Sequence, residues 1–300
     1  MYDVIICGSG PAGMSAALFL RRANLNILIV EKGTPCGKLI STALIENYPG
    51  YIENTGIDLA MIMYRQVKHF KIPYAFSEVM KIEKLGDEHF VVHTKEGDYE
   101  SKMVIWAAGT IAKQIEAEGE EEYVGRGISY CAICDGSFHE KQNVVVIGGG
   151  NSAIEEALYL AKICKKVTII TRGHHFRADP VLMEKVMRAN NVDLVTHHVI
   201  TKFTGKDLLE QVTAKDRDSD NEIVLNVRGA FIYVGFTPSS TLLENFDILD
   251  EDKYIIVDRN CETKVTGLYA AGDCIQKNIR QIATAVADGI TCASAIVRKI

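Results

Sequence analysis

The chain has 300 residues, of which 47% are hydrophobic and 24% are charged, and its formal net charge is -6. This length is enough for about two domains, and an acidic balance without a basic stripe argues against nucleic acid as a partner. No apolar run reaches the roughly 18 residues of a membrane span, and MYDVIICGSG lacks the features of a secretory signal, so we expect a cytoplasmic protein that is not bound to a membrane.

The first predicted element is a short apolar strand that runs directly into a glycine-rich turn. Residues 3–7 (DVIIC) are followed by a helix-like stretch (MSAALFLRR) after the turn residues Gly8, Ser9, Gly10, Pro11, Ala12 and Gly13. A second apolar strand at 26–30 leads to Glu31. Such glycines permit a tight turn, close approach of backbone to a pyrophosphate and close helix–strand packing. The helix N-terminus then offers N–H groups and partial positive charge to the phosphates.

The same order of elements returns in the middle of the chain. A strand at 143–147 (NVVVI) precedes a helix at 154–163 and a strand at 166–170. The turn between the first two consists of Gly148, Gly149, Gly150, Asn151, Ser152 and Ala153. One such motif is weak evidence, but two copies, each between a strand and a helix, predict two nucleotide-binding βαβ units.

The residues at the end of the second strand differ between the two copies. Glu31 can bond both hydroxyls of an adenosine ribose and repels a 2′-phosphate, so the first unit suits FAD or NAD. The second copy reads TRGHHFR at 171–177, which has no acidic residue and contains Arg172 and Arg177. A 2′-phosphate is therefore tolerated, and attracted by the two arginines, in the second unit.

Two further stretches predict how the units are joined. VIWAAGT at 104–110 and GLYAAGDC at 267–274 are strands that end in small residues, and a helix rich in small residues follows the second. Their candidate cofactor-binding residues are Ala108, Gly109, Gly272, Asp273, Arg280, Gln281 and Ile282. The C-terminal elements complete the first unit. We therefore predict an α/β fold of two Rossmann-like nucleotide-binding domains, the second inserted into the first.

Eight cysteines stand at positions 7, 36, 131, 134, 164, 261, 274 and 292, and only Cys131 and Cys134 have a motif spacing. A C-x-x-C pair can be a zinc half-site, a redox dithiol or two core thiols. Zinc needs two more ligands, and no second pair occurs at metal spacing, so no metal site is predicted. The polar, glycine-flanked surroundings and the neighbouring Asp135 favour a redox dithiol. The other six are expected to be small buried hydrophobic residues in a reducing compartment.

The order of these motifs resembles that of the low-molecular-weight thioredoxin reductases. The segments that carry the resemblance span essentially the whole chain: GSGPAG, ENYPG, AAGT, CAICDG, GGGNSAIEEA, FRA, YVGFTP, GLYAAGDC and RQIATA. The resemblance implies an FAD-binding domain at 1–111 and 241–300 and an NAD(P)H-binding domain at 112–240. It also implies a homodimer, and domains that rotate about hinges near Ala112–Gln114 and Pro238–Ser240.

The resemblance also assigns roles to individual residues. FAD, bound tightly and without a covalent bond, would additionally contact Lys32, Gly37, Lys38, Leu39 and Asn47. Cys134 would face the flavin and form a transient adduct, and Cys131 would attack the disulfide of thioredoxin. Asp135 would protonate the leaving thiolate. Electrons would pass from NADPH to FAD, then to the Cys131–Cys134 disulfide, and then to thioredoxin.

Three departures from the family's pattern bear on the electron donor and the partner. The usual His-Arg-Arg-x-x-x-Arg motif has Thr171 and Gly173 in place of its histidine and second arginine. Lys38 replaces a usual glutamine near the flavin, and Ser137 and Phe138 stand where two aromatic residues help dock thioredoxin. NADH, a ferredoxin or a deazaflavin stay open as electron donors. A flavin-dependent dithiol oxidase that uses oxygen, and a flavoprotein redox sensor, stay open as functions.

Overall fold

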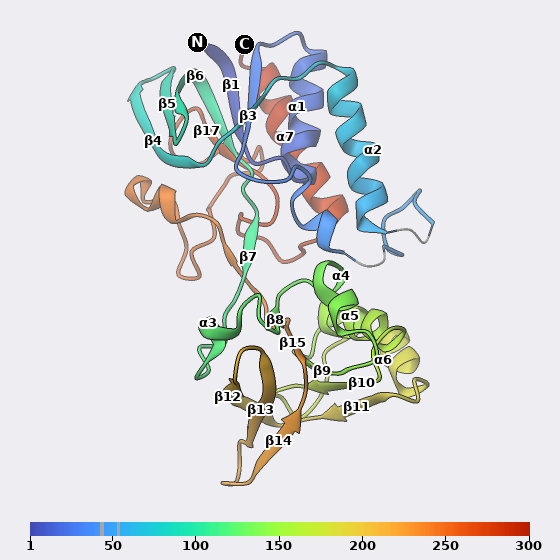
Figure 1. Ribbon diagram of the computed structural model, residues 1–300. Coiled ribbons are helices and arrows are strands. Elements are labelled where there is room, and N and C mark those ends of the chain that lie inside the picture. The colour runs from blue at the N-terminus through green and yellow to red at the C-terminus, as the bar shows by residue number, and fades with distance from the viewer. Residues whose placement is uncertain (43–44, 53–54) are drawn as a thin grey trace. The chain divides into compact units, whose positions relative to one another are not determined.

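The computed structural model describes residues 1–42, 45–52 and 55–300, which fold as two compact units (Figure 1). The first unit is built from residues 1–40, 45–111 and 237–300, and the second mainly from residues 112–236. The second unit is therefore inserted into the first, as the sequence predicts. Among the described helices, none is long and apolar enough to span a membrane.

The first unit is a mixed sheet of seven strands against which helices pack (Figure 1). The strand order is β3-β2-β1-β6-β5-β4, and β17 also pairs with β6. β1, β2, β3, β6 and β17 are parallel, and β4 and β5 extend the sheet in antiparallel fashion. The elements are β1 (Tyr2–Cys7), α1 (Pro11–Arg22), β2 (Ile27–Glu31), η1 (Gly37–Ser41), α2 (Gly56–His69), β3 (Tyr74–Phe76), β4 (Val79–Gly86), β5 (His89–Thr94), β6 (Gly97–Trp106), η3 (Thr241–Phe246), β17 (Leu268–Ala270) and α7 (Ile282–Val297).

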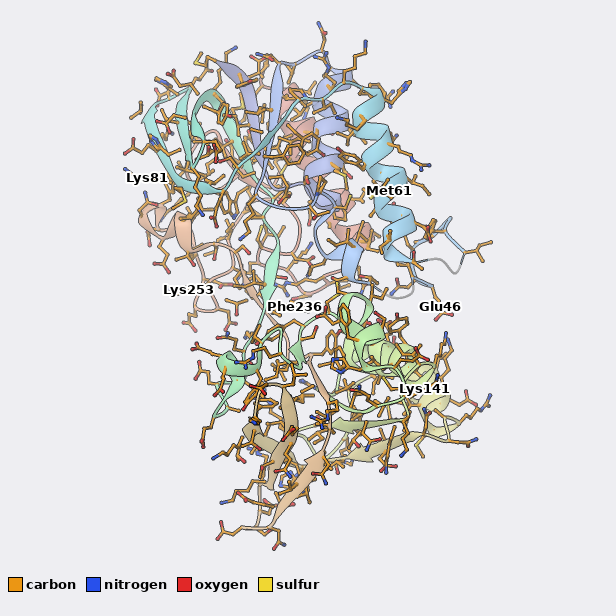
Figure 2. All side chains as sticks on the ribbon, in the orientation of Figure 1. Glu46, Met61, Lys81, Lys141, Phe236 and Lys253 are labelled. Atoms are coloured by element: carbon orange, nitrogen blue, oxygen red, sulfur yellow. A yellow bond between two sulfur atoms is a disulfide. The ribbon has the colours of Figure 1, made fainter. Side chains whose placement is uncertain are left out.

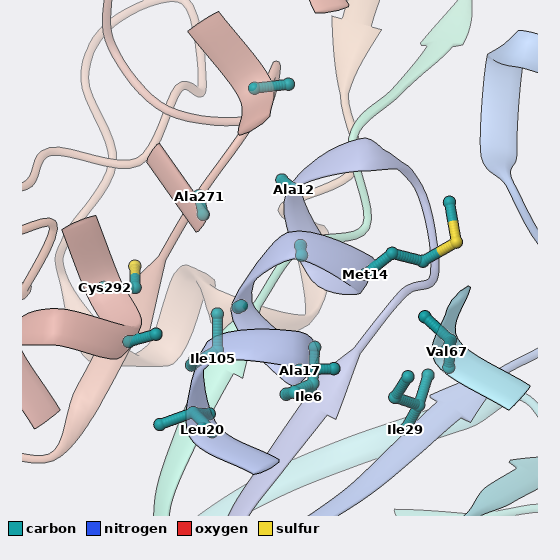
Figure 3. Close-up of a cluster of buried hydrophobic side chains, with 14 of the residues drawn as sticks. Ile6, Ala12, Met14, Ala17, Leu20, Ile29, Val67, Ile105, Ala271 and Cys292 are labelled. Atoms are coloured by element: carbon teal, nitrogen blue, oxygen red, sulfur yellow. The ribbon is translucent and has the colours of Figure 1, made fainter. Parts of the chain in front are cut away.

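Strand β1 is buried on both faces of this sheet. Val4 and Ile6 point into a core shared with the helices, whereas Ile5 and Cys7 point into a second core on the opposite face. This alternation follows from the two-residue period of a strand, and a continuous apolar run is typical of a strand that is covered on both sides. Figure 3 shows the helix-side core, to which Ile6 and the small Ala17 both belong.

Helices α1 and α7 pack closely because the residues that face each other are small. A Cβ built on Gly289 of α7 would lie 2.1 Å from the carbonyl oxygen of Ala12 and 3.1 Å from the nitrogen of Ala16. Cys292, one turn further along α7, is fully buried in the same core. The contact ties the C-terminal helix to the helix that follows the first glycine-rich turn.

The second unit combines a parallel sheet with a small antiparallel one. The parallel order is β11-β10-β9-β15-β8, and β12-β13-β14 are antiparallel. Along β9, Val144 and Val146 pack with α5 and α6, whereas Val145 and Ile147 share a core with Phe203 of β12. The elements are α3 (Glu120–Tyr123), β8 (Ile128–Ser129), α4 (Ala132–Asp135), η2 (Gly136–His139), β9 (Asn143–Ile147), α5 (Asn151–Ala161), β10 (Lys166–Ile170), α6 (Pro180–Met187), β11 (Val192–Val195), β12 (His198–Gly205), β13 (Leu209–Asp216), β14 (Glu222–Asn226) and β15 (Gly229–Ile232).

The chain passes between the units along two strands, β7 (Thr110–Ala112) and β16 (Phe236–Pro238), which pair with each other. Phe236 is labelled at this point in Figure 2. The return crossing falls between Phe236 and Thr237, whereas the resemblance places it after Ser240. The two segments that connect the units, β7 and β16, are short strands that are hydrogen-bonded to each other.

The helices of both βαβ units begin earlier than the sequence predicts. α1 starts at Pro11 and α5 at Asn151, so the last residues of each glycine-rich run are already helical. Gly10 and Gly150 are the extended residues that precede the helices. Proline suits the first helical position because its missing N–H would have no partner inside the helix and its φ is already helical.

We expect Gly289→Ala to destabilise the protein, although alanine is the better helix former. The gain in helix propensity is about 1 kcal/mol. A Cβ only 2.1 Å from the Ala12 oxygen forces α1 and α7 apart, and overpacking of this kind costs about 1–3 kcal/mol or more. Thermal unfolding measures the difference, with the exposed Gly33→Ala as control, since no described atom lies within 4 Å of a Cβ there. An unchanged or higher melting temperature for Gly289→Ala would contradict this account of the packing.

Candidate functional site

The first glycine-rich turn is tightly packed on one side and open at Gly10. A Cβ on Gly8, whose φ is +105°, would lie 2.5 Å from the Ala107 carbonyl oxygen, and a Cβ on Gly13 would lie 2.0 Å from that of Gly8. Gly37 passes so near that its Cβ would be 3.3 Å from the Cα of Gly10. In contrast, no described atom lies within 4 Å of a Cβ built on Gly10. The N-terminus of α1 therefore begins beside an open space, as pyrophosphate binding requires.

Glu31 lies at the end of β2 and bonds to this turn. One carboxylate oxygen accepts the N–H of Ser9 at 2.9 Å and its hydroxyl at 3.1 Å, and the other accepts the N–H of Gly33 at 3.0 Å. The carboxylate is thus held where the ribose of a bound dinucleotide is expected. Lys32, also predicted in this site, instead lies near Glu78 at 3.8 Å and is 67% exposed.

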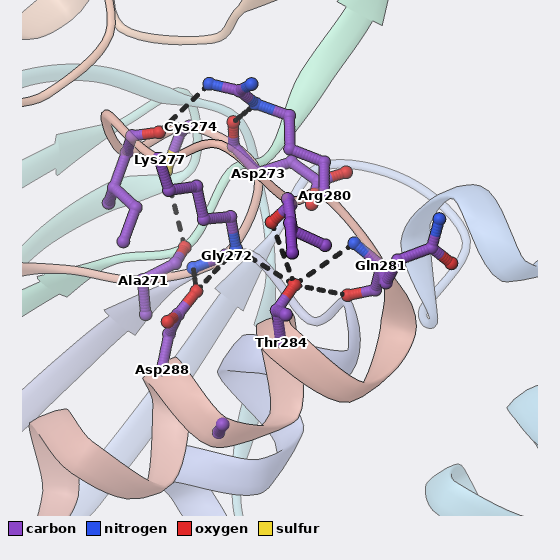
Figure 4. Close-up of polar contacts among 12 residues, drawn as sticks. Ala271, Gly272, Asp273, Cys274, Lys277, Arg280, Gln281, Thr284 and Asp288 are labelled. Carbon is purple, nitrogen blue, oxygen red and sulfur yellow. Dashed lines mark hydrogen bonds and ion pairs between the residues drawn. The ribbon is translucent and has the colours of Figure 1, made fainter. Parts of the chain in front are cut away.

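The C-terminal loop of the first unit passes close to the start of α1. Gly272 has a φ of +88°, and a Cβ on it would lie 3.0 Å from the Cβ of Ala12. Its N–H donates to Asp288 at 3.2 Å, and Lys277 pairs with the same carboxylate at 2.6 Å (Figure 4). This largely buried ion pair fixes the loop where it approaches the glycine-rich turn.

Arg280 and Gln281 order the segment that leads into α7. The Arg280 guanidinium donates to the carbonyl oxygens of Asp273 at 3.1 Å and Ile275 at 3.2 Å (Figure 4). The side-chain oxygen of Gln281 accepts the amide of Asn47 at 3.3 Å, and α7 begins at the next residue, Ile282. Four residues that the sequence predicts as cofactor ligands thus lie in one connected group: Asn47, Asp273, Arg280 and Gln281.

Lys38 connects two other predicted segments. Its ammonium group donates to the hydroxyl of Thr110 at 2.9 Å and forms an ion pair with Asp273. Thr110 directly follows the Ala108–Gly109 turn, in which Gly109 has a φ of +65°. Leu39, next to the lysine, is buried. Lys38 therefore puts a positive charge beside Asp273.

The second glycine-rich turn repeats the geometry of the first. A Cβ on Gly148 would lie 2.3 Å from the carbonyl oxygen of Tyr233, and a Cβ on Gly149 would lie 2.5 Å from the Thr171 hydroxyl. No described atom lies within 4 Å of a Cβ built on Gly150. The N-terminus of α5 therefore also begins beside an open space.

The first residues of α5 have distinct structural roles. Asn151 donates to the Asp179 carboxylate and accepts the Asp179 N–H, both at 2.8 Å, which ties α5 to the start of α6. Ser152 is exposed. Ala153 is buried, and its Cβ would lie 3.0 Å from a Cβ on Gly148, so a small residue is needed at the place of the motif's third glycine.

The predicted phosphate-binding arginines lie on the loop after β10. Arg172 and Arg177 are exposed, and the N–H of Arg177 donates to the Gly149 oxygen at 2.6 Å, beside the second glycine-rich turn. A third arginine, Arg217, was not predicted: its guanidinium donates to the Arg172 carbonyl at 3.3 Å. It comes from the β13–β14 connection, and no motif spacing indicates it.

One group of potential metal ligands is present in the described part of the chain, although the sequence predicts no metal site. The ligand atoms of His174, His197 and Asp218 lie within 4.8 Å of one another. The two imidazole rings are stacked, with centroids 3.8 Å apart and planes at 11°. A metal ion binds a ring nitrogen in the plane of the ring, and two stacked parallel rings share no such point. We therefore interpret the group as packing that supports the arginine-bearing loop.

Cys131 and Cys134 form a disulfide at the start of a short helix. Cys131 precedes α4, and its sulfur accepts the N–H of Cys134 at 3.1 Å. The Ser129 hydroxyl accepts the N–H of Cys131 at 3.0 Å. Cys134 is exposed and Cys131 is half-buried. The predicted pair is thus closed and accessible, as a redox-active disulfide must be.

The other six cysteines are free and buried, as the sequence predicts. Burial raises the pKa of Cys7 and Cys274 to about 12 and that of Cys36 and Cys164 to about 11. Thiols of this kind stay protonated at neutral pH and are poor nucleophiles. The pKa values of these four thiols therefore disfavour thiol–disulfide chemistry at them, in contrast to the accessible Cys131–Cys134 pair.

Asp135, the residue that follows Cys134, lines a cavity of about 570 Å³ to which neither redox cysteine contributes. The lining also includes Phe138, which is 77% exposed, His139, and two arginines, Arg126 and Arg228. Burial lowers the pKa of His139, although the negative charge of Asp135 acts in the opposite direction. The cavity therefore presents a carboxylate, an aromatic ring and two guanidinium groups.

A disulfide and two open glycine-rich turns on two Rossmann-like units define a nucleotide-dependent disulfide oxidoreductase. The chain matches the pyridine nucleotide-disulphide oxidoreductase family over residues 2–289 and belongs to that family.

Individual relatives are similar over nearly their whole length. The chain is 40% identical to the thioredoxin reductase of Bacillus subtilis (strain 168) over 299 residues, which covers 99% of this chain and 94% of that protein. The crystal structure of Lactococcus lactis thioredoxin reductase (FR conformation) matches with a TM-score of 0.96 at 37% identity and covers 100% of both chains. That of T. acidophilum thioredoxin reductase matches with a TM-score of 0.95 at 34% identity and covers 99% of this chain and 98% of that one. These similarities confirm the predicted family and fold class.

Proposed function

We propose that the protein is a flavin-dependent thioredoxin-disulfide reductase. The observation that carries the proposal is the closed, accessible Cys131–Cys134 disulfide in the unit that also bears the second glycine-rich turn. Full-length similarity to proteins named thioredoxin reductase supports this activity. It does not favour an oxidase that passes electrons to oxygen.

FAD fits the residues of the first unit. Gly10 leaves space for a pyrophosphate, and Glu31 offers a carboxylate for the ribose hydroxyls. We therefore assign tight, non-covalent FAD binding to residues 1–111 and 241–300, and NAD(P)H binding to residues 112–240. When bound, FAD supplies a two-electron carrier between a nicotinamide and a disulfide.

The dithiol reaction uses two thiols of this chain and one disulfide of the partner. The Cys131 thiolate attacks one sulfur of the thioredoxin disulfide, which forms a mixed disulfide and releases a thiolate that takes up a proton. Cys134 then attacks the mixed disulfide, which closes the Cys131–Cys134 bond and releases thioredoxin as a dithiol. We assign the proton transfer to Asp135, because it follows Cys134 directly in the chain and lines a cavity.

NADPH is the electron donor that the second unit suits best. Arg172 and Arg177 flank the loop beside the turn, and Arg217 adds a third guanidinium group to it. Thr171, at the end of β10, offers no carboxylate to select a free ribose. Because Gly173 replaces one arginine of the family's motif, we expect only a modest preference for NADPH over NADH.

Thioredoxin is the proposed partner, and Phe138, which is exposed and lies four residues after Cys134 in the chain, is available to contact it. An exposed apolar row on α2 supports the homodimer that the resemblance implies: Ile57, Met61 and Ile62 are 45%, 43% and 53% exposed. The hinges near Ala112–Gln114 and Pro238–Ser240 and the cytoplasmic location stay predictions.

Gly10→Leu should give a folded protein without flavin. Leucine can adopt the φ of −71° at this position without meeting a described atom at its Cβ, but its side chain fills the space that we assign to the pyrophosphate. Visible absorbance measures the flavin content, and circular dichroism measures the fold. Gly86→Leu, at an exposed glycine of β4 where a Cβ would meet only the Cβ of His89 at 3.8 Å among the described atoms, is the control. Full flavin content in folded Gly10→Leu would remove the FAD assignment.

Cys131→Ser and Cys134→Ser should each abolish thioredoxin reduction while the nucleotide still bleaches the flavin. Each variant lacks one of the two sulfurs that the exchange reaction needs. Steady-state turnover with thioredoxin and anaerobic flavin bleaching measure the two steps. Cys164→Ala, at a free buried cysteine of the same unit, is the control. Turnover near that of the wild type in either serine variant would exclude the dithiol from the mechanism.

Combining Arg172→Ala with Arg177→Ala should raise the KM for NADPH and leave that for NADH nearly unchanged. A charge-assisted hydrogen bond contributes about 1.5–3 kcal/mol, or about tenfold to a hundredfold in affinity. Anaerobic flavin reduction by the two nucleotides, side by side, measures the effect. Arg188→Ala, at an exposed arginine paired with Glu184, is the control. Equal rates with both nucleotides in the wild type would refute the phosphate site, and reduction by neither would indicate a ferredoxin or deazaflavin donor.

A further inference from the structure

Tyr233 lies between the redox disulfide and the second glycine-rich turn. Its hydroxyl accepts the N–H of Ala132, the residue that follows Cys131, at 2.8 Å. Its own N–H donates to the carbonyl oxygen of Ile147 in β9 at 2.7 Å. Its carbonyl oxygen approaches Gly148 so closely that a Cβ there would be 2.3 Å away. One residue thus contacts the backbone of both functional segments.

Burial of the C-x-x-C segment makes the hydrogen bond to Ala132 necessary. Ala132 is 0% exposed, and a buried donor without an acceptor costs about 1–3 kcal/mol. The first N–H groups of a helix have no partner within the helix. In α4, the N–H of Cys134 goes to the Cys131 sulfur, so Tyr233 supplies the acceptor that the short helix itself cannot provide for Ala132.

The phenol of Tyr233 is neutral at physiological pH. Burial raises its pKa, and the negative charges of Glu156 and, more weakly, Asp135 raise it further, whereas the bond from the Ala132 N–H acts in the opposite direction. Glu156, on α5, is itself buried. A neutral hydroxyl accepts from Ala132 through its oxygen and keeps its own hydrogen for another acceptor. The contact to the C-x-x-C segment therefore persists across the working pH range.

We infer that Tyr233 is a positioning residue for the redox disulfide. Its hydroxyl holds the backbone between Cys131 and Cys134 in the closed form, while its main chain is anchored to β9 beside the second glycine-rich turn. Reduction of the disulfide takes two electrons and two protons and yields two thiols. Tyr233 supplies none of these and changes only the relative free energies of the disulfide and dithiol forms. The consequence for turnover rests on the proposed function, but the effect on the disulfide itself does not.

Tyr233→Phe tests this inference, because it removes the hydroxyl and keeps the ring. The lost bond stabilises the closed form, so the equilibrium with oxidised and reduced dithiothreitol should shift toward the dithiol by about three- to tenfold. A tenfold shift corresponds to about 30 mV. Thiol alkylation of the holoenzyme followed by mass spectrometry measures the oxidised fraction of Cys131 and Cys134. Tyr123→Phe is the matched control, since its buried hydroxyl donates to the Gly205 carbonyl at 2.7 Å within the same unit.

Two further measurements make the test independent of the dithiothreitol titration. The Ala132 amide should exchange its hydrogen slowly in the wild type and faster in Tyr233→Phe. The kcat for thioredoxin should fall in Tyr233→Phe, because a dithiol that is easier to form is a weaker reductant. The KM for the nucleotide should stay constant, because phenylalanine preserves the main-chain contacts with β9 and Gly148.

Equal dithiothreitol equilibria in Tyr233→Phe and Tyr123→Phe would overturn the inference. Unprotected exchange of the Ala132 amide in the wild type would overturn it as well. Failure of the proposed function is distinguishable: a wild-type protein that reduces no thioredoxin refutes that function, while the dithiothreitol equilibrium still reports on Tyr233.

Discussion

The close approach of backbone at two glycine-rich turns is the constraint on which the functional architecture depends. At Gly8 and Gly148, the chain passes so near a neighbouring carbonyl oxygen that a Cβ would lie 2.5 Å and 2.3 Å away. Both residues have a positive φ, which glycine adopts without strain. Each turn lets a helix begin directly beyond a strand, beside an open position at Gly10 or Gly150. A larger side chain at either close approach would separate strand from helix and remove the site.

The partners in these close approaches carry functional segments of their own. In the first unit, the carbonyl that faces Gly8 belongs to Ala107, which leads into the Ala108–Gly109 turn. In the second unit, the corresponding carbonyl belongs to Tyr233, whose hydroxyl reaches the backbone between the redox cysteines. In both units, a backbone carbonyl thus packs against the first glycine of the turn. We propose that this contact positions a cofactor-binding segment in the first unit and the disulfide in the second.

Sequence patterns within short segments predicted the strands, the turns and the disulfide of this architecture. The contacts that they did not predict join residues that are far apart in the chain. The strands, the glycine-rich turns and the C-x-x-C pair are contiguous in sequence, so periodicity and spacing indicate them directly. Arg217 approaches Arg172 from 45 residues away, Tyr233 bonds Ala132 from 101 residues away, and Lys38 pairs with Asp273 from 235 residues away. Tertiary packing creates these contacts, and no local motif encodes them.

The structure also bears on which cysteine attacks the partner. Exposure alone would favour Cys134, because Cys134 is exposed whereas Cys131 is half-buried. Nucleophilic attack requires a thiolate, and a hydrogen-bond donor stabilises the charged form. The sulfur that already accepts such a donor is that of Cys131, through the Cys134 N–H at 3.1 Å. Since Tyr233 engages the neighbouring Ala132 N–H, it also helps keep this donor in place. The local hydrogen bonds of the closed form therefore support our proposal that Cys131 is the attacking thiolate and that Cys134 closes the disulfide.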